Sequence, residues 1–135
     1  MNYYYDCEFL EGTQDKKILG IKVGETKPTI DLISIGIVSE DNREYYAISK
    51  DFNLRDAWNR YDLQETSPAK KYMGIYEEKI YWIRENVLRQ IFNEMAMWDR
   101  NDDKHSYFTY NNFKYLVNKY GKSNKQIAED VYAFT

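Results

Sequence analysis

The sequence has little of what exported or membrane proteins use. Its 135 residues include a single cysteine, Cys7, so no disulfide can form within the chain, and neither a charged-then-apolar leader nor a long apolar run is present. These absences argue against secretion and membrane insertion, and we expect a cytoplasmic protein. The length suits one domain, residues 1–135, that buries a core of its own.

The chain also lacks a basic excess. With 19 Lys and Arg against 22 Asp and Glu, its net charge is −3, which argues against a protein that binds nucleic acid stoichiometrically. An enzyme that releases its product is less constrained, because bound metal ions can supply the local positive charge. The 14 tyrosines and 17% aromatic content suit base stacking, but aromatics are common in strands and cores, and we assign most of them to packing.

The first candidate for chemistry is the aromatic segment YYYDCEFLEG, residues 3–12. Asp6 and Glu8 are two residues apart, so on a strand their side chains share one face, while Cys7 and Phe9 can face a core. Two adjacent carboxylates repel each other, and a divalent cation such as Mg²⁺ or Mn²⁺ between them removes this repulsion. The alternative is a solvated strand face, which is the commoner outcome for an isolated Asp-x-Glu pair.

A second apolar run begins at Pro28 and Thr29 and continues to Val38. Its near-continuous β-branched character indicates a strand buried on both faces. The turn-forming residues 40–43 follow, and the segment EYYAIS at 44–49 then completes a hairpin. We therefore predict an α/β fold with a mixed sheet that opens with three strands and is followed by helices.

The remaining predicted elements follow from apolar periodicity and capping residues. In chain order they are a loop or ribbon over 16–26, a short helix capped by Asn53, an irregular segment over 61–76, an amphipathic helix over about 77–95, a charged loop over 98–106, a helix over about 110–120 that stops at Gly121, and a last helix with a Ser123–Gln126 capping box.

As a set, five segments resemble the small bacterial and phage 3'-to-5' exoribonucleases of the DEDDh superfamily, relatives of ribonuclease T. They are residues 5–9, 29–38, 44–49, 82–88 and 127–134. The resemblance runs along most of the chain and implies a ribonuclease H-like sheet. By alignment to the family the sheet is incomplete, because the chain stops at the end of the helix that precedes the fourth strand.

The resemblance implies two-metal hydrolysis of RNA phosphodiester bonds, which releases nucleoside monophosphates from the 3' end of single-stranded RNA. In this family four acids hold two Mg²⁺ or Mn²⁺ ions and a histidine is the general base. Carried over to this sequence, the resemblance implies that Asp6 would bridge both metals and that Glu8 would ligate one while hydrogen-bonding the terminal ribose hydroxyl. Backbone groups of Phe9 and Leu10 would lie against the 3'-terminal nucleotide.

The family's other acidic motifs are absent. The segment NNFKYL at 111–116 has lysine in place of the second motif's aspartate, and helical core packing fits it better. His105 is followed by Tyr110 where the third motif has its aspartate. We interpret His105, with Asp102 and Asp103 beside it, as part of a solvated charged loop.

Three hypotheses follow. The first is the N-terminal portion of a DEDDh exoribonuclease, with weak metal binding and no activity as this isolated chain. The second is a catalytically dead nuclease-fold module that binds or supports a partner, and the third is a non-nuclease domain whose Asp-x-Glu pair is coincidental.

Without a fourth strand, residues 3–10 form an aromatic sheet edge with no proline or lysine. We expect that edge to pair with a second copy, which gives a homo-oligomer.

Overall fold

A computed structural model describes residues 1–13, 15–19, 21–25, 27–99 and 103–135. Its strands are β1 (Tyr3–Gly12), β2 (Asp15–Ile18), β3 (Ile21–Glu25), β4 (Thr29–Ser39), β5 (Glu44–Ile48), β6 (Asp62–Glu65) and β7 (Glu77–Ile80). Its helices are α1 (Leu54–Asn59), α2 (Pro68–Tyr72), α3 (Arg89–Trp98), α4 (Tyr110–Tyr120) and α5 (Asn124–Phe134), with a π-helical turn at Arg84–Leu88 and a 3-10 turn at Asp103–His105. Every helix among the described residues is too short or too polar to cross a membrane.

The main sheet has three strands in the order β1-β4-β5, which confirms the predicted three-stranded opening and its hairpin. β1 pairs with β4 from Tyr3 opposite Ser39 to Gly12 opposite Thr29. β4 is the central strand, and its residues from Asp31 to Ile37 are all buried or half-buried, which agrees with its near-continuous apolar sequence. The described strand pairs are all antiparallel, so the expectation of a mixed sheet was wrong.

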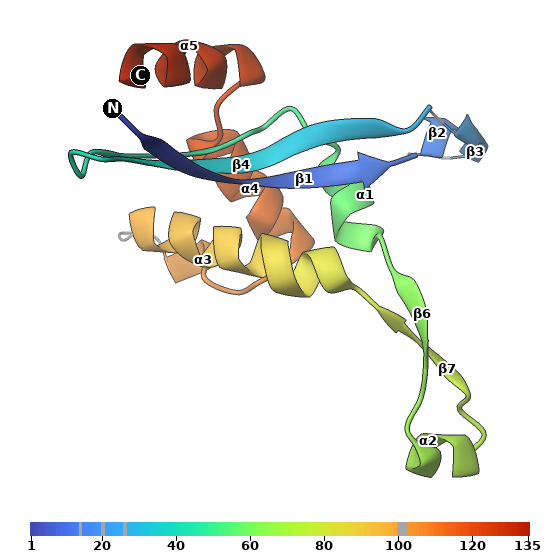
Figure 1. The fold of residues 1–135 in the computed structure, drawn as a ribbon. Coiled ribbons are helices and arrows are strands. Elements are labelled where there is room, and N and C mark those ends of the chain that lie inside the picture. The colour runs from blue at the N-terminus through green and yellow to red at the C-terminus, as the bar shows by residue number, and fades with distance from the viewer. Residues whose placement is uncertain (14, 20, 26, 100–102) are drawn as a thin grey trace.

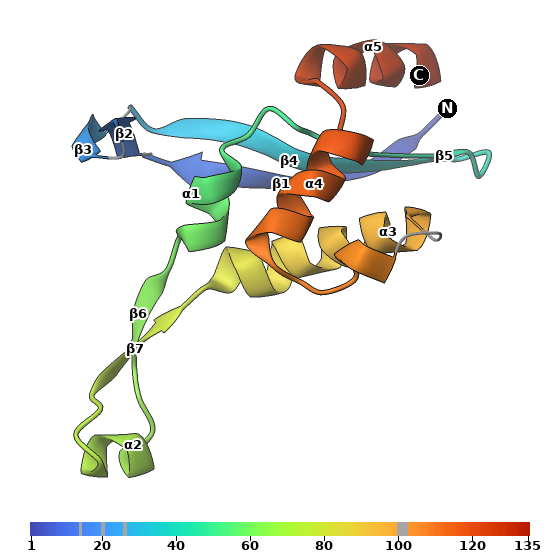
Figure 2. The ribbon, with the colours of Figure 1, turned by 180° about the vertical axis from the view of Figure 1, so that it is seen from behind.

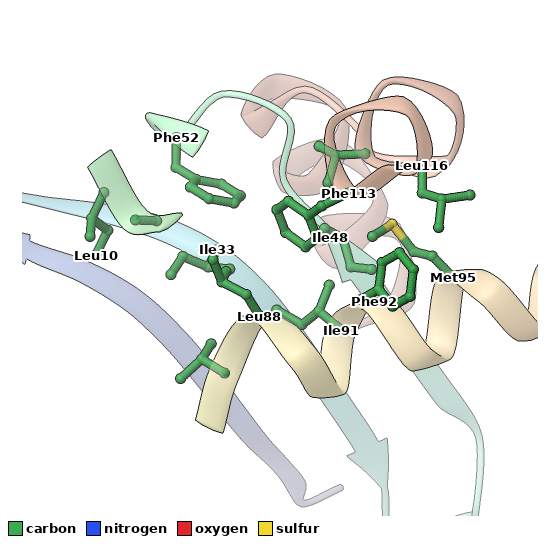
Figure 3. Packing of buried hydrophobic residues seen from close by; sticks show 13 residues of the cluster. Leu10, Ile33, Ile48, Phe52, Leu88, Ile91, Phe92, Met95, Phe113 and Leu116 are labelled. Carbon is green, nitrogen blue, oxygen red and sulfur yellow. The ribbon is translucent and has the colours of Figure 1, made fainter. Parts of the chain in front are cut away.

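Helices lie on both faces of this sheet (Figures 1 and 2). α3 lies below the sheet as drawn in Figure 1, and α4, which packs against α3, runs from beside it up to the level of the strands. α5 lies above the sheet, near the N-terminus. The core lies between the sheet and the α3–α4 layer (Figure 3). Its most buried members, each at most 2% exposed, are Leu10, Ile33, Ile48, Ala57, Leu88, Phe92, Met95, Phe113, Leu116 and Val117.

Helix α5 is fastened to the opposite face by polar and aromatic contacts. The Tyr45 hydroxyl and the Lys122 ammonium each donate to an Asp130 carboxylate oxygen at 2.8 Å, and the Tyr3 and Phe134 rings meet edge-on at 6.0 Å. Hydrogen bonds from Lys122, Gln126 and Tyr45 lower the pKa of Asp130 to about 2. The carboxylate is therefore charged at neutral pH and holds the helix to β5.

Strands β6 and β7 form an arm with α2 at its tip, residues 62–80, which projects from the body (Figure 1). Two predictions were wrong here. The segment 61–76 is not irregular, and Glu77–Ile80 is a strand rather than the first turn of a helix. The apolar period that begins at Ile80 continues into α3, so periodicity in this region did not distinguish strand from helix.

Local start and stop signals were more reliable. The Asn53 side chain accepts from the Asp56 amide at 3.0 Å, the Ser123 hydroxyl accepts from the Gln126 amide at 3.1 Å, and α4 ends before Gly121, all as predicted. The segment 16–26 contains the β2–β3 ribbon, while residues 20 and 26 lie outside the described part of the chain. Trp98, assigned to a loop from the sequence, is the last residue of α3.

Candidate functional site

Asp6 and Glu8 lie on the same face of β1, as their spacing predicted, and both line one cleft. This is the face toward α3, because Leu10, the next residue in the alternation, is fully buried in the core. The expectation that Cys7 and Phe9 face the core was therefore wrong: Cys7 is half-buried and Phe9 is 43% exposed. Asp6 is exposed and Glu8 is half-buried, so the pair lies at the margin of the core.

The cleft has a volume of about 500 Å³ and lies between the sheet and the α3 layer, within the range of small-molecule sites. It is lined by Asp6, Glu8, Ser34, Gly36, Tyr46, Val87, Gln90, Ile91, Glu94 and Trp98. These residues come from β1, β4, β5, the π-helical turn and α3. Three of its described lining residues are acidic and none is basic, so the cleft favours cations.

The contribution of α3 was not predicted. Gln90, Glu94 and Trp98 recur every four residues, so they form one stripe along the helix, beside the buried Ile91 and Met95. The amphipathic pattern predicted the apolar stripe, and the same spacing places Gln90, Glu94 and Trp98 on the stripe beside it. Nothing local shows that this stripe faces Asp6 and Glu8, because that depends on how the helix packs on the sheet.

The charges of the cleft acids act on two neighbouring groups. Burial raises the pKa of the Tyr46 phenol, a hydrogen bond with Ser34 lowers it, and the charges of Glu94 and Glu8 raise it further. Burial, followed by the charges of Asp6 and Glu8, likewise raises the pKa of the Cys7 thiol. Both groups are therefore neutral at neutral pH, and both lie within the negative field of the cleft acids.

The side chains present suit a divalent cation only in part. Asp6 and Glu8 offer the carboxylate oxygens that Mg²⁺ and Mn²⁺ prefer. Among the described residues, however, no group of three or more His, Cys, Asp and Glu side chains is arranged so that it could hold a metal ion. A four-acid, two-metal centre therefore does not fit the described part of the chain. A single ion held by one or two carboxylates, with water and phosphate completing its ligands, does fit.

His105 is not the freely solvated residue that we expected. Its ring stacks on Tyr115 with centroids 3.8 Å apart, and its Nδ1 is 4.0 Å from Asp99 Oδ2. Asp99 is buried and accepts hydrogen bonds from Lys119 and from the Tyr120 hydroxyl, which lower its pKa. His105 is thus part of the packing between the 3-10 turn and α4, and it does not line the cleft.

The other sequence-predicted candidates are placed apart from the cleft. Phe9 lines a second cavity, of about 280 Å³, at the base of the arm, and the side chain of Leu10 is enclosed in the core. In the segment 111–116, Phe113 and Leu116 are buried, which confirms helical core packing. Asp102 lies outside the described residues, as does the side chain of Asp103.

Comparison with known proteins gives a partial match. Over 53 residues the chain is 45% identical to two proteins of Mycobacterium tuberculosis, from different strains, each named a 3'-5' exoribonuclease. The matched segment is 39% of this chain and 23% of each relative, so the chain matches less than a quarter of their length. No family profile matches the chain. No solved structure matches it either.

Proposed function

We propose that this chain is a relative of the DEDDh-type 3'-to-5' exoribonucleases, with a ribonuclease H-like sheet, and that its acidic cleft receives the 3' end of single-stranded RNA. The observation that carries the proposal is the Asp6–Glu8 pair, which lies on one strand face and lines a cleft of nucleotide size. The partial identity to proteins named 3'-5' exoribonucleases supports the choice of RNA.

The charge of the cleft makes RNA binding depend on a divalent cation. Asp6, Glu8 and Glu94 would repel a phosphate, and a bound Mg²⁺ or Mn²⁺ supplies the positive charge that offsets this repulsion. Asp6 and Glu8 would hold the ion, and with two protein ligands its dissociation constant should be roughly millimolar. Phosphate oxygens of the RNA would complete the coordination.

Turnover by this chain alone is not expected. Loss of a two-metal centre removes most of the electrostatic stabilisation that such a reaction needs, and the described acids do not form that centre. The second candidate function is a catalytically inactive RNA-binding module. It is favoured by the finding that the described acids do not form a two-metal centre. The two candidates share the cleft and differ in whether RNA is cleaved.

One experiment addresses both candidates. We expect a 5'-fluorescein-labelled oligoribonucleotide to bind the full chain in Mg²⁺, measured by fluorescence anisotropy, and to be released by EDTA. Asp6→Ala and Glu8→Ala should weaken binding by about tenfold or more. The control is Glu11→Ala, which removes an equal charge from an exposed residue on the same strand, outside the cleft.

The same samples are resolved on a denaturing gel, where the oligoribonucleotide should stay intact. Release of nucleoside monophosphates that is abolished by Asp6→Ala would instead show a complete catalytic site. RNA binding that is indifferent to EDTA and to both cleft variants would overturn the proposal and favour a non-nuclease domain.

A further inference from the structure

A second charged surface lies outside the cleft and has the opposite sign. Arg55 of α1, Arg84 of the π-helical turn and Arg89 of α3 lie at the corner formed by α1 and the first turns of α3 and α4 (Figure 2). The exposed Lys114 is one helical turn beyond Tyr110 on α4, on the same face of that helix. We call these four cationic residues the basic patch, and none of them lines the cleft.

Aromatic rings hold the guanidinium groups of the basic patch in place. Arg84 lies 4.7 Å over the Trp58 ring, and its Nε donates to the Trp58 carbonyl oxygen at 2.7 Å. Arg55 lies 4.6 Å over the Tyr110 ring, whose centroid is 5.8 Å from that of Trp58. The two guanidinium groups are therefore held on neighbouring rings, and side chains that are already ordered lose less conformational entropy when a ligand binds.

Most of the positive charge of the basic patch has no carboxylate partner. Arg89 is the exception, because its Nε and one terminal nitrogen donate to Glu85 at 2.9 and 2.6 Å. Arg55, Arg84 and Lys114 form no ion pair among the described residues. An arginine that is stacked by its face keeps its forked N–H edge for a carboxylate, which it can bind with two hydrogen bonds.

The basic patch suits the carboxylates of a protein better than a nucleic acid. A protein that binds nucleic acid through the backbone makes about 6–10 phosphate contacts, more than three cations supply. Single strands also stack their bases on open aromatic rings, whereas arginines already cover one face of Trp58 and of Tyr110. The net charge of −3 opposes a long polyanion, but a short acidic segment needs only two or three local cations.

We propose that the basic patch binds an acidic segment of a partner protein, whose Asp or Glu carboxylates pair with Arg55, Arg84 and Lys114. Arginine is enriched in protein–protein interfaces, and hydrogen bonds between ionised groups are the stronger ones. The patch shares no residue with the cleft, so this binding needs neither a divalent cation nor RNA.

The test uses the full chain and a fluorescein-labelled peptide of alternating Glu and Gly residues, with the matching Gln–Gly peptide as the uncharged probe. EDTA is present so that no cation bridges the peptide to the acidic cleft. We expect only the Glu peptide to bind, measured by fluorescence anisotropy. Its affinity should fall when NaCl is raised from about 0.05 M to about 0.5 M, because salt screens exposed charges.

Substitutions within the basic patch test its residues. Arg55→Gln should weaken binding of the Glu peptide by about tenfold, the usual effect of losing a hydrogen bond to a charged group. Arg55→Lys keeps the charge but not the forked donors, so it should recover only part of the affinity. Lys114→Gln should also weaken binding. The control is Lys125→Gln, which removes an exposed charge from α5, on the opposite side of the sheet from α3, and should bind as the unsubstituted chain does.

Arg84→Gln tests the contact at the π-helical turn and should weaken binding in the same way. Because Arg84 is hydrogen-bonded to α1, thermal unfolding checks that this variant keeps its fold. If it does not fold, Arg55→Gln and Lys114→Gln still decide, since both change exposed residues.

Two results would overturn the proposal. One is equal affinity for the Glu and Gln peptides, or for the unsubstituted chain and both Arg55→Gln and Lys114→Gln. The other is displacement of the Glu peptide by an oligoribonucleotide in EDTA, with binding of that RNA lost in Arg55→Gln. The second result would assign the basic patch to nucleic acid instead of a protein.

Discussion

At the scale of single residues, Gly121 shows how a correct prediction can have a different physical cause. Glycine commonly ends a helix because it adopts a left-handed conformation, yet Gly121 has φ −68° and ψ 152°, which any residue can adopt. Glycine is required for space instead. A Cβ atom there would lie 2.5 Å from the Val117 carbonyl oxygen and 3.0 Å from Lys50 Cβ.

We therefore expect Gly121→Ala to lower the free energy of unfolding by about 1–3 kcal/mol, the usual cost of overpacking. Urea denaturation followed by circular dichroism measures it. The control is Gly36→Ala, whose Cβ would meet Tyr46 Cδ2 at an ordinary 3.6 Å. Equal free energies of unfolding for the two variants would contradict this expectation, and would show that the backbone between α4 and α5 can shift to make room for the added methyl group.

At the scale of elements, the arm has no residue in the buried core cluster. An isolated two-stranded hairpin is marginally stable in water. The arm adds the ion pairs Lys70–Glu78 and Lys71–Glu65, and surface pairs of this kind contribute little. At its tip, Tyr72 and Met73 are 95% and 74% exposed. Local opening should therefore begin in the arm while the body stays folded.

Limited chymotrypsin digestion checks this expectation. The first cut should follow Tyr72, and the cleaved chain should keep its helical circular dichroism signal. Tyr72→Ser should slow that first cut without changing the melting temperature. A first cut within α3 or α4 would contradict the order of stability that the packing implies.

At the scale of the whole molecule, the strand order leaves one edge of β1 without a partner strand among the described residues. Tyr4 and Tyr5 on this strand are 65% and 74% exposed. Unpaired backbone groups beside exposed aromatics favour pairing with another strand. We propose that two copies pair through this edge and form a two-fold homodimer.

Size-exclusion chromatography with light scattering should give the dimer mass. Tyr5→Lys, which places a charge on the edge, should shift the equilibrium toward the monomer. Tyr72→Lys changes a still more exposed tyrosine, on the arm, and should leave the mass unchanged. A monomer at all concentrations, with amides of residues 3–10 exchanging as freely as a loop, would reject this assembly.

The sequence by itself determined the local features of this protein. These features depend on neighbours within a few residues. They are the three strands of the sheet, the caps at Asn53 and Ser123, helices α4 and α5, and the shared face of Asp6 and Glu8. Periodicity and side-chain capping act at that range, so a single sequence contains them.

Tertiary structure decided which faces meet. Three features depend on contacts between segments that are distant in the sequence. Leu10 is buried rather than Phe9, and Glu77–Ile80 pairs with Asp62–Glu65. Glu94 and Trp98 line the same cleft as the Asp6–Glu8 pair. The strand Glu77–Ile80 is short and polar, so its sequence has no apolar alternation that would identify it as a strand. The polar stripe of α3 becomes a cleft wall only because the apolar stripe beside it packs on the sheet.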